Sequence, residues 1–245
     1  MNPEIRIFED NEALSFAAAD IFARAARQAI SVRGRFLTAL SGGGTPLGMY
    51  RLLAAEPFRS EMEWDKTHIF WGDERCVPPD DPGSNYPQAQ ETLLALVPIP
   101  PDNIHRIKGE LTPQVASDDY TQLLIQFAEA DRDWPRFDFI LLGMGEDGHT
   151  ASLFPGSPVD VDASVLPVTA HYQDRPANRV TLTPPVINDA HLVVFLTTGA
   201  AKAVTLSRVL SDKKNDIKLP AQRIQPHDGK LVWLVDKGAA SQLTK

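Results

Sequence analysis

Cysteine is almost absent from this sequence, and so are long apolar runs. The 245 residues include one cysteine, Cys76, so the chain can form no internal disulfide, and a lone thiol fits a reducing compartment. No apolar run approaches the roughly 18 residues of a membrane-spanning helix. The N-terminal MNPEIRIFED lacks the basic stretch and apolar core of a secretory signal. These absences predict a cytoplasmic protein that does not interact with membranes.

Basic residues are outnumbered by acidic ones. The chain has 24 Lys and Arg against 32 Asp and Glu, which gives a formal net charge of −8. Nucleic acids are bound by basic surfaces, so this balance argues against nucleic acid as the main partner. A small phosphorylated ligand remains compatible with it, because a few backbone N–H groups and two or three Arg or Lys side chains suffice to bind one phosphate.

The usual metal-ligand spacings are missing as well. Neither H-x-x-x-H nor C-x-x-C occurs, so the sequence gives no support for a metal site. A hydrophobic content of 43% and a charged content of 23% are ordinary for a soluble globular protein. Residues 1–245 are most simply one domain with room for a small additional lobe, working as a monomer or a small homo-oligomer.

Short apolar runs alternate with stretches of helical periodicity along the chain. Strands are predicted over residues 5–10, 35–40, 67–72, 137–142, 165–170, 178–183, 191–199 and 230–235. Helices are predicted over residues 12–32, 45–54, 86–96, 113–130 and 200–210, the second with Thr45 as N-cap and Pro46 at its first position. Alternating strands and helices indicate an α/β fold with a mostly parallel central sheet and helices on both faces.

The segment LGMGEDGHTASLFPG, residues 142–156, matches G-x-G-x-x-G directly after a predicted strand. A dinucleotide site would need the third glycine to open a helix, and Pro155 and Pro158 interrupt any helix longer than about two turns. The segment is therefore predicted to be a glycine-rich turn at the carboxyl end of a strand, where open α/β sheets place ligands.

Two further polar loops follow predicted strands. SGGGTP, residues 41–46, leads from a strand into a helix, and its three glycines leave backbone N–H groups free to bind an anion such as phosphate. It lacks the Lys-Ser/Thr end of a Walker loop. The loop from Asp73 to Tyr86 begins with DER and includes Asn85, and its prolines and Gly83 permit it to act as a lid. Three strand ends that carry polar loops are expected to converge on one crevice.

His149 is the one histidine embedded in a glycine turn. A neutral imidazole is a suitable general base at physiological pH, and Asp147 could fix its tautomer and stabilise its protonated form. His68, His105, His171, His191 and His227 are interpreted as structural or surface residues. Arg179 opens a predicted strand, and Lys202 falls in the first turn of a predicted helix, where a cation opposes the helix dipole and suggests a nearby phosphate.

Taken in order, SGGGTP, GDERCVPPDDPGSNY, GMGEDGHTASLFPG, RVTLTPPVIN and GAAKA resemble the motifs of the bacterial single-domain 6-phosphogluconolactonases over nearly the whole chain. The resemblance implies a fold shared with glucosamine-6-phosphate deaminase and ribose-5-phosphate isomerase. It also implies hydrolysis of 6-phospho-D-glucono-1,5-lactone in the pentose phosphate pathway, with no cofactor. The catalytic residues implied are His149 and Asp147. The substrate-binding residues implied are Ser41, Gly42, Gly43, Gly44, Thr45, Asp73, Arg75, Asn85, Gly145, Arg179 and Lys202.

Three alternatives remain open at this point. The same fold could carry an isomerase or deaminase of a hexosamine 6-phosphate, with Asp73 as the proton-transfer base, although DGHTASLFPG counts against it. The protein could also be a catalytically inactive sugar-phosphate sensor. Ser152 could be a nucleophile beside His149, but a lactone is an activated ester that needs no covalent intermediate, so Ser152 is interpreted as structural.

Overall fold

The centre of the protein is a six-stranded parallel sheet, seen in a computed structural model that describes residues 3–158, 161–211 and 219–243. Every pair of neighbouring strands in this sheet is parallel, as the sequence predicts. Across the sheet the strands are β1 (Glu4–Phe8), β9 (Lys230–Asp236), β8 (Leu192–Thr197), β5 (Phe139–Gly143), β2 (Phe36–Leu40) and β3 (Thr67–Trp71).

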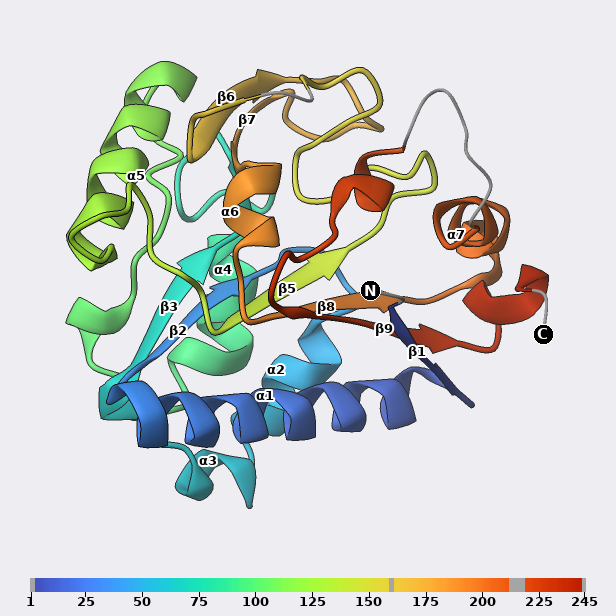
Figure 1. Cartoon of the computed structure of the whole chain (residues 1–245), viewed down its shortest axis with the longest axis horizontal. Coiled ribbons are helices and arrows are strands. Elements are labelled where there is room, and N and C mark those ends of the chain that lie inside the picture. The colour runs from blue at the N-terminus through green and yellow to red at the C-terminus, as the bar shows by residue number, and fades with distance from the viewer. Residues whose placement is uncertain (1–2, 159–160, 212–218, 244–245) are drawn as a thin grey trace.

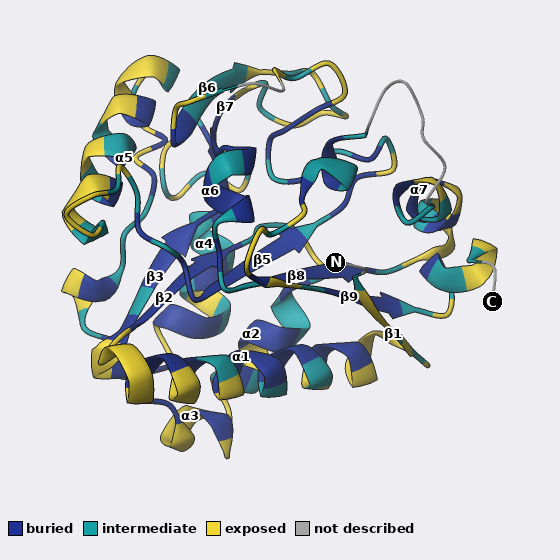
Figure 2. Ribbon diagram, viewed as in Figure 1, coloured by how far each residue is buried: buried dark blue, intermediate teal, exposed yellow. Residues whose placement is uncertain are grey.

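Helices cover both faces of this sheet (Figure 1). Those on one side are α1 (Asn11–Arg33), α2 (Leu47–Leu53) and α3 (Phe58–Glu61), while α5 (Pro113–Phe127) and α6 (Pro184–Asn188) lie on the other. The remaining helices are α4 (Tyr86–Ala89), which continues into a π turn at Gln90–Leu94, and α7 (Ala203–Val209). The central strands are buried, and α1 exposes only its outer side (Figure 2). No helix in the described ranges has the length and hydropathy needed to cross a bilayer.

The first helix shows how local sequence sets an element's bounds. Asp10 is its N-cap, and the Asp10 Oδ1 atom accepts a hydrogen bond from the Ala13 N–H at 2.9 Å. Gly34 ends the helix in the left-handed region, with φ +76°, which favours glycine. The predicted helix over residues 12–32 is confirmed to within one residue at each end. Its buried alanines let it pack closely against the sheet.

The sequence misassigns two local features. Thr45 is not an N-cap, because α2 begins at Leu47 and the Thr45 hydroxyl instead lies 3.3 Å from the Thr198 hydroxyl. Residues 73–75, predicted as the start of a loop, form β4 (Asp73–Arg75). This strand joins β7 (Asn178–Leu182) and β6 (Val165–Thr169) in an antiparallel three-stranded sheet, which is the small lobe for which the sequence left room. Three charged residues carry no periodicity, so only their pairing with β7 reveals the strand.

His68 on β3 and His105 form a partly buried pair. The His68 Nδ1 atom lies 3.1 Å from the His105 Nε2 atom, the two rings stack, and Phe70 and Phe127 pack against them. Burial, followed by the nearby charge of His68, lowers the pKa of His105 to about 4. Burial, followed by the charge of Arg35, lowers the pKa of His68. The folded protein therefore favours the neutral form of both rings.

We expect this pair to make folding stability depend on pH. An unfolded histidine titrates near 6.5, whereas His105 in the folded chain takes up a proton only near pH 4. The neutral His105 ring therefore makes its full contribution to the free energy of unfolding above about pH 6.5. This contribution is lost as the pH falls toward 4, by about 1–2 kcal/mol after discounting for solvent screening. Urea unfolding of the wild type and His105→Gln at pH 7, 5.5 and 4.5 measures this. His227→Gln, at an exposed position, is the control. An identical pH dependence in His105→Gln and the wild type would contradict the expectation.

Candidate active site

A cavity of about 200 Å³ opens at the carboxyl ends of the parallel strands. It lies where the strand order changes direction around β2, with β3 on one side and β5 on the other, which is where open α/β sheets bind ligands. The loops after β2, β3 and β5 all reach it, as the sequence predicts, and Thr197 and Thr198 add the end of β8. All predicted substrate-binding residues and His149 line this cavity, while Asp147 lies behind His149.

The glycine loop after β2 is held with its backbone facing the cavity. The Tyr50 hydroxyl donates to the Ser41 carbonyl at 2.6 Å, and the Gly43 N–H donates to Gln88 Oε1 at 3.2 Å. Gly42 must be glycine, because a Cβ there would lie 1.8 Å from Asn85 Oδ1. Within the described residues the N–H groups of Gly42, Gly44 and Thr45 have no protein acceptor. This loop therefore offers free donors to an anionic or hydroxyl-bearing ligand.

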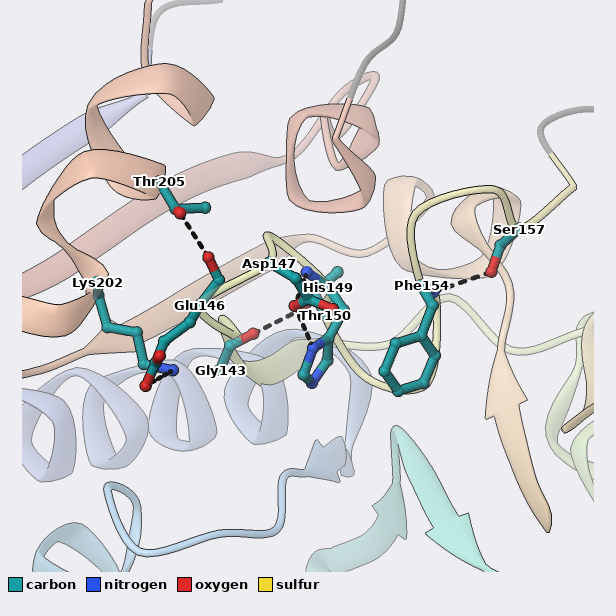
Figure 3. A network of polar contacts seen from close by, with 9 residues as sticks. All are labelled: Gly143, Glu146, Asp147, His149, Thr150, Phe154, Ser157, Lys202 and Thr205. Atoms are coloured by element: carbon teal, nitrogen blue, oxygen red, sulfur yellow. Dashed lines mark hydrogen bonds and ion pairs between the residues drawn. The ribbon is translucent and has the colours of Figure 1, made fainter. Parts of the chain in front are cut away.

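The imidazole of His149 is fixed on three sides. Its Nδ1 atom lies 2.6 Å from Asp147 Oδ1, and the same oxygen accepts the His149 backbone N–H at 3.1 Å (Figure 3). The ring stacks on Phe154 at a centroid distance of 4.5 Å and meets the edge of Tyr172 at 4.6 Å. Nε2 is left as the ring nitrogen with no protein partner among the described residues. This is the arrangement of a histidine base oriented by a carboxylate.

Asp147 keeps its charge although it is partly buried. Burial by itself would raise its pKa, but the hydrogen bonds from the His149 ring and backbone outweigh burial, and the pKa is lowered. An ionised carboxylate at this distance stabilises a protonated imidazole. The turn that carries both residues is tied down by the Thr150 hydroxyl, which donates to the Gly143 carbonyl at 2.8 Å (Figure 3). The spacing of two residues thus brings a histidine ring and a carboxylate into direct contact.

Two arginines face each other across the small sheet. Arg75 on β4 pairs directly with Arg179 on β7, and both are almost fully buried. Among the described residues, Arg75 Nε, Arg179 Nε and Arg179 Nη2 have no hydrogen-bond partner. Burial, together with the charges of Arg75 and Arg175, lowers the pKa of Arg179, while the charge of Asp73 opposes this. Like charges placed opposite each other are unfavourable unless an anion lies between them, so the pair has the charge and the free donors that an anion would need.

Lys202 brings a third cation to the same cavity from the turn before α7. Its Nζ atom lies 4.0 Å from Glu146 Oε1 (Figure 3). The pKa of Lys202 is lowered overall. Burial is the largest cause and the charge of Arg175 adds to it, while Glu146 and Asp147 oppose it. A lysine that keeps only a long contact with its nearest carboxylate is available to a negatively charged ligand.

The segment from β4 to the start of α4, residues 73–86, is organised by buried hydrogen bonds. The Ser152 hydroxyl donates a buried hydrogen bond to Asp73 Oδ2 at 2.6 Å. This contact fits the interpretation of Ser152 as a structural residue. Asn85 Nδ2 donates to the Asp73 carbonyl at 2.9 Å, which leaves Asn85 Oδ1 as a buried acceptor without a partner in the described chain. Glu74, whose pKa burial raises, accepts the N–H groups of Arg75, Asn85 and Tyr86. Glu74 therefore shapes the loop, and Asn85 Oδ1 is free for a ligand hydroxyl.

Sequence reasoning missed the part of the cavity wall that comes from the loop between β6 and β7. Tyr172, Gln173 and Arg175 line it from the loop between β6 and β7. Their signal was weak, because an arginine and a tyrosine in a polar loop are usually solvated. The clue was the position of YQDRP between two short strands that end beside other site residues.

Comparisons with known proteins, by sequence and by structure, point to the same family. The sequence profile of a family described as glucosamine-6-phosphate isomerases/6-phosphogluconolactonase matches residues 9–233. A 6-phosphogluconolactonase of Nostoc sp. is 38% identical over the full length of both chains, and one of Synechocystis sp. is 38% identical over 99% of each. The 6-phosphogluconolactonase structure from Trypanosoma brucei has 31% identity and a TM-score of 0.88 over 99% of both chains. A monomeric glucosamine-6-phosphate deaminase, at 21% identity and a TM-score of 0.83 over 98% of this chain and 99% of its own, shares the fold.

Proposed function

The chain belongs to the family of glucosamine-6-phosphate isomerases and 6-phosphogluconolactonases, and on this premise we propose how it works as a 6-phosphogluconolactonase. The reaction is hydrolysis of 6-phospho-D-glucono-1,5-lactone to 6-phosphogluconate in the pentose phosphate pathway. One observation carries the proposal: a histidine held by a carboxylate lines the same cavity as Arg75, Arg179 and Lys202. A lactone ester and a phosphate on one substrate require both features at once.

His149 acts first as base and then as acid. Its Nε2 takes a proton from water as the water oxygen attacks the lactone carbonyl carbon, and the Asp147 carboxylate stabilises the imidazolium that forms. The tetrahedral intermediate then collapses, the bond from C1 to the ring oxygen breaks, and the imidazolium returns the proton to that oxygen. The positive charge of Arg75, which lines the same cavity, favours the oxyanion as it develops. No covalent intermediate is needed.

Substrate binding is divided among the remaining residues. Arg179, Lys202 and the Ser41–Thr45 loop supply charge and N–H donors for the anionic substrate. Among the described residues, two Arg179 nitrogens and the N–H groups of Gly42, Gly44 and Thr45 have no protein partner, and Lys202 keeps only a long contact with Glu146. Asn85 Oδ1 and the carboxylate of Asp73 supply acceptors for sugar hydroxyls. The two kinds of group lie in one cavity, as binding of a phosphorylated sugar requires.

A coupled assay tests the reaction. Freshly prepared lactone decays spontaneously, and the product is measured with 6-phosphogluconate dehydrogenase, with and without this protein. Acceleration supports the proposal. Absence of acceleration, with release of ammonia from glucosamine 6-phosphate, would favour the isomerase or deaminase alternative with Asp73 as base. Ligand binding with neither activity would favour the sugar-phosphate sensor.

We expect Gly145→Ala to lower kcat by about 100-fold, which is the low end of a general base's contribution. A Cβ on Gly145 would lie 2.1 Å from His149 Nδ1 and 2.6 Å from Asp147 Oδ1, so the pair must separate to admit it. Gly72→Ala is the matched control, because a Cβ there meets its nearest atom at an ordinary 3.6 Å. Steady-state kinetics and thermal unfolding of both variants separate the site effect from folding. Full activity in Gly145→Ala would contradict the importance of this close approach.

A further inference from the structure

The loop between β6 and β7 is a defined part of the cavity wall. The Ala170 N–H donates to the Ala177 carbonyl at 2.9 Å and closes the base of the hairpin. Within the loop, Gln173 adopts φ +52°, a left-handed conformation that is uncommon for a residue other than glycine. Such a conformation persists only when the surrounding contacts enforce it, and it clusters at functional sites. The loop therefore has a specific shape beside the ligand cavity.

Contacts at both ends of the loop connect it to the rest of the site. Tyr172 meets the His149 ring edge-on at 4.6 Å, with an interplanar angle of 73°. Pro176 packs against Gly83 of the 73–86 loop so closely that a Cβ on Gly83 would lie 3.0 Å from Pro176 Cγ. Between these two anchors, Gln173 and Arg175 line the cavity.

Arg175 places a positive charge beside the cavity. It is an exposed residue of the cavity wall, and it forms no ion pair within the described residues. Its positive charge lowers the pKa of Lys202 and of Arg179, in each case as a smaller effect than burial, so it lies within electrostatic range of both. Glu146 and Asp147 oppose it at Lys202, and Asp73 opposes it at Arg179. These cations lie around one cavity and repel one another until a multiply charged anion enters.

We propose that Arg175 is a specificity-determining residue, which binds the phosphate of the substrate and so selects phosphorylated over unphosphorylated sugar lactones. The proposal rests on the proposed function for the reaction. Its binding step, in which Arg175 binds a phosphate dianion, can be tested without the reaction. Arg175 reaches the phosphate from the hairpin loop, together with Lys202 from the turn before α7. Because Arg175 is exposed, salt screens its contribution more than that of the buried Arg179.

The test compares two substrates that differ only in the phosphate. For Arg175→Gln we expect KM for 6-phosphogluconolactone to rise about tenfold, as for loss of one charge-assisted contact, with kcat nearly unchanged. Hydrolysis of glucono-1,5-lactone should not change. Arg175→Lys should recover most of the loss, and raising the salt concentration should shrink the difference between Arg175→Gln and the wild type. Arg208→Gln, on the exposed side of α7, is the matched control.

Two results would overturn the proposal. The first is an unchanged KM for the phosphorylated lactone in Arg175→Gln. The second is an equal loss for both lactones, which would indicate that the residue only holds Tyr172 and the loop in place. Calorimetric binding of inorganic phosphate and of 6-phosphogluconate to both proteins distinguishes this failure from failure of the proposed function. If the wild type hydrolyses neither lactone, weaker phosphate binding by Arg175→Gln still supports the phosphate site, and equal binding rejects it.

Discussion

Replacing His149 with alanine lowers kcat by about 100- to 10,000-fold, the range that a positioned general base contributes. The KM and the inhibition constant of 6-phosphogluconate change by less than about threefold, because the imidazole acts on a proton and not on the phosphate. This expectation follows from the geometry, in which Nδ1 is bound to Asp147 and Nε2 is the nitrogen left for water. The measurement is steady-state hydrolysis of fresh lactone, corrected for spontaneous decay, with product inhibition in the same assay.

Two variants sharpen the interpretation of that result. His227→Ala removes an exposed histidine and should leave both constants unchanged. Asp147→Asn keeps the shape of the side chain but removes the charge that stabilises the imidazolium, so its kcat should fall less than that of His149→Ala. Equal losses of rate and product affinity in His149→Ala would show that His149 binds substrate instead of acting as the base.

Replacing Arg179 with methionine or Lys202 with alanine raises KM by about 10- to 100-fold, since a hydrogen bond to a charged group contributes roughly 1.5–3 kcal/mol. Arg179 should give the larger effect, because it is buried, has two nitrogens without partners in the described part of the chain, and acts where solvent screening is weak. Methionine keeps most of the volume of the side chain that packs over Phe154. For both variants kcat should change little.

The controls for this prediction address charge and folding separately. Arg208→Met removes one exposed cation and should leave KM unchanged. Thermal unfolding without ligand should show that Arg179→Met is no less stable than the wild type, because the variant relieves the repulsion with Arg75. An unchanged KM in both Arg179→Met and Lys202→Ala would remove them from the substrate site.

Much of the fold was predictable because its signals are local. The strands of the parallel sheet are short apolar runs, and the turns after β2 and β5 carry glycines that mark where the chain can bend beside a ligand. The pairing of His149 with Asp147 was predictable for the same reason, since two residues of a tight turn lie close together whatever the rest of the fold does.

The features that were missed depend on partners far away in the sequence. β4 consists of three charged residues, which form a strand only because β7 pairs with them from about a hundred residues further along the chain. Tyr172 and Arg175 belong to the site because a hairpin folds over it, and no local pattern encodes that return. Thr45 has the sequence of a helix cap, but its hydroxyl lies beside Thr198 at the end of β8, so the tertiary contact overrides the local preference.

Because Arg75 and Arg179 lie directly opposite each other, the stability of the small sheet depends on whether an anionic ligand is bound. The two like charges repel each other across the β4–β7 pairing, and a bound anion would offset that repulsion. A ligand that binds only the folded state adds its binding free energy to stability. Under this linkage the β4–β7 pairing is firmest when substrate or product is abundant and weakest when flux through the pathway stops, so the enzyme's turnover by cellular proteases would follow the supply of its own substrate.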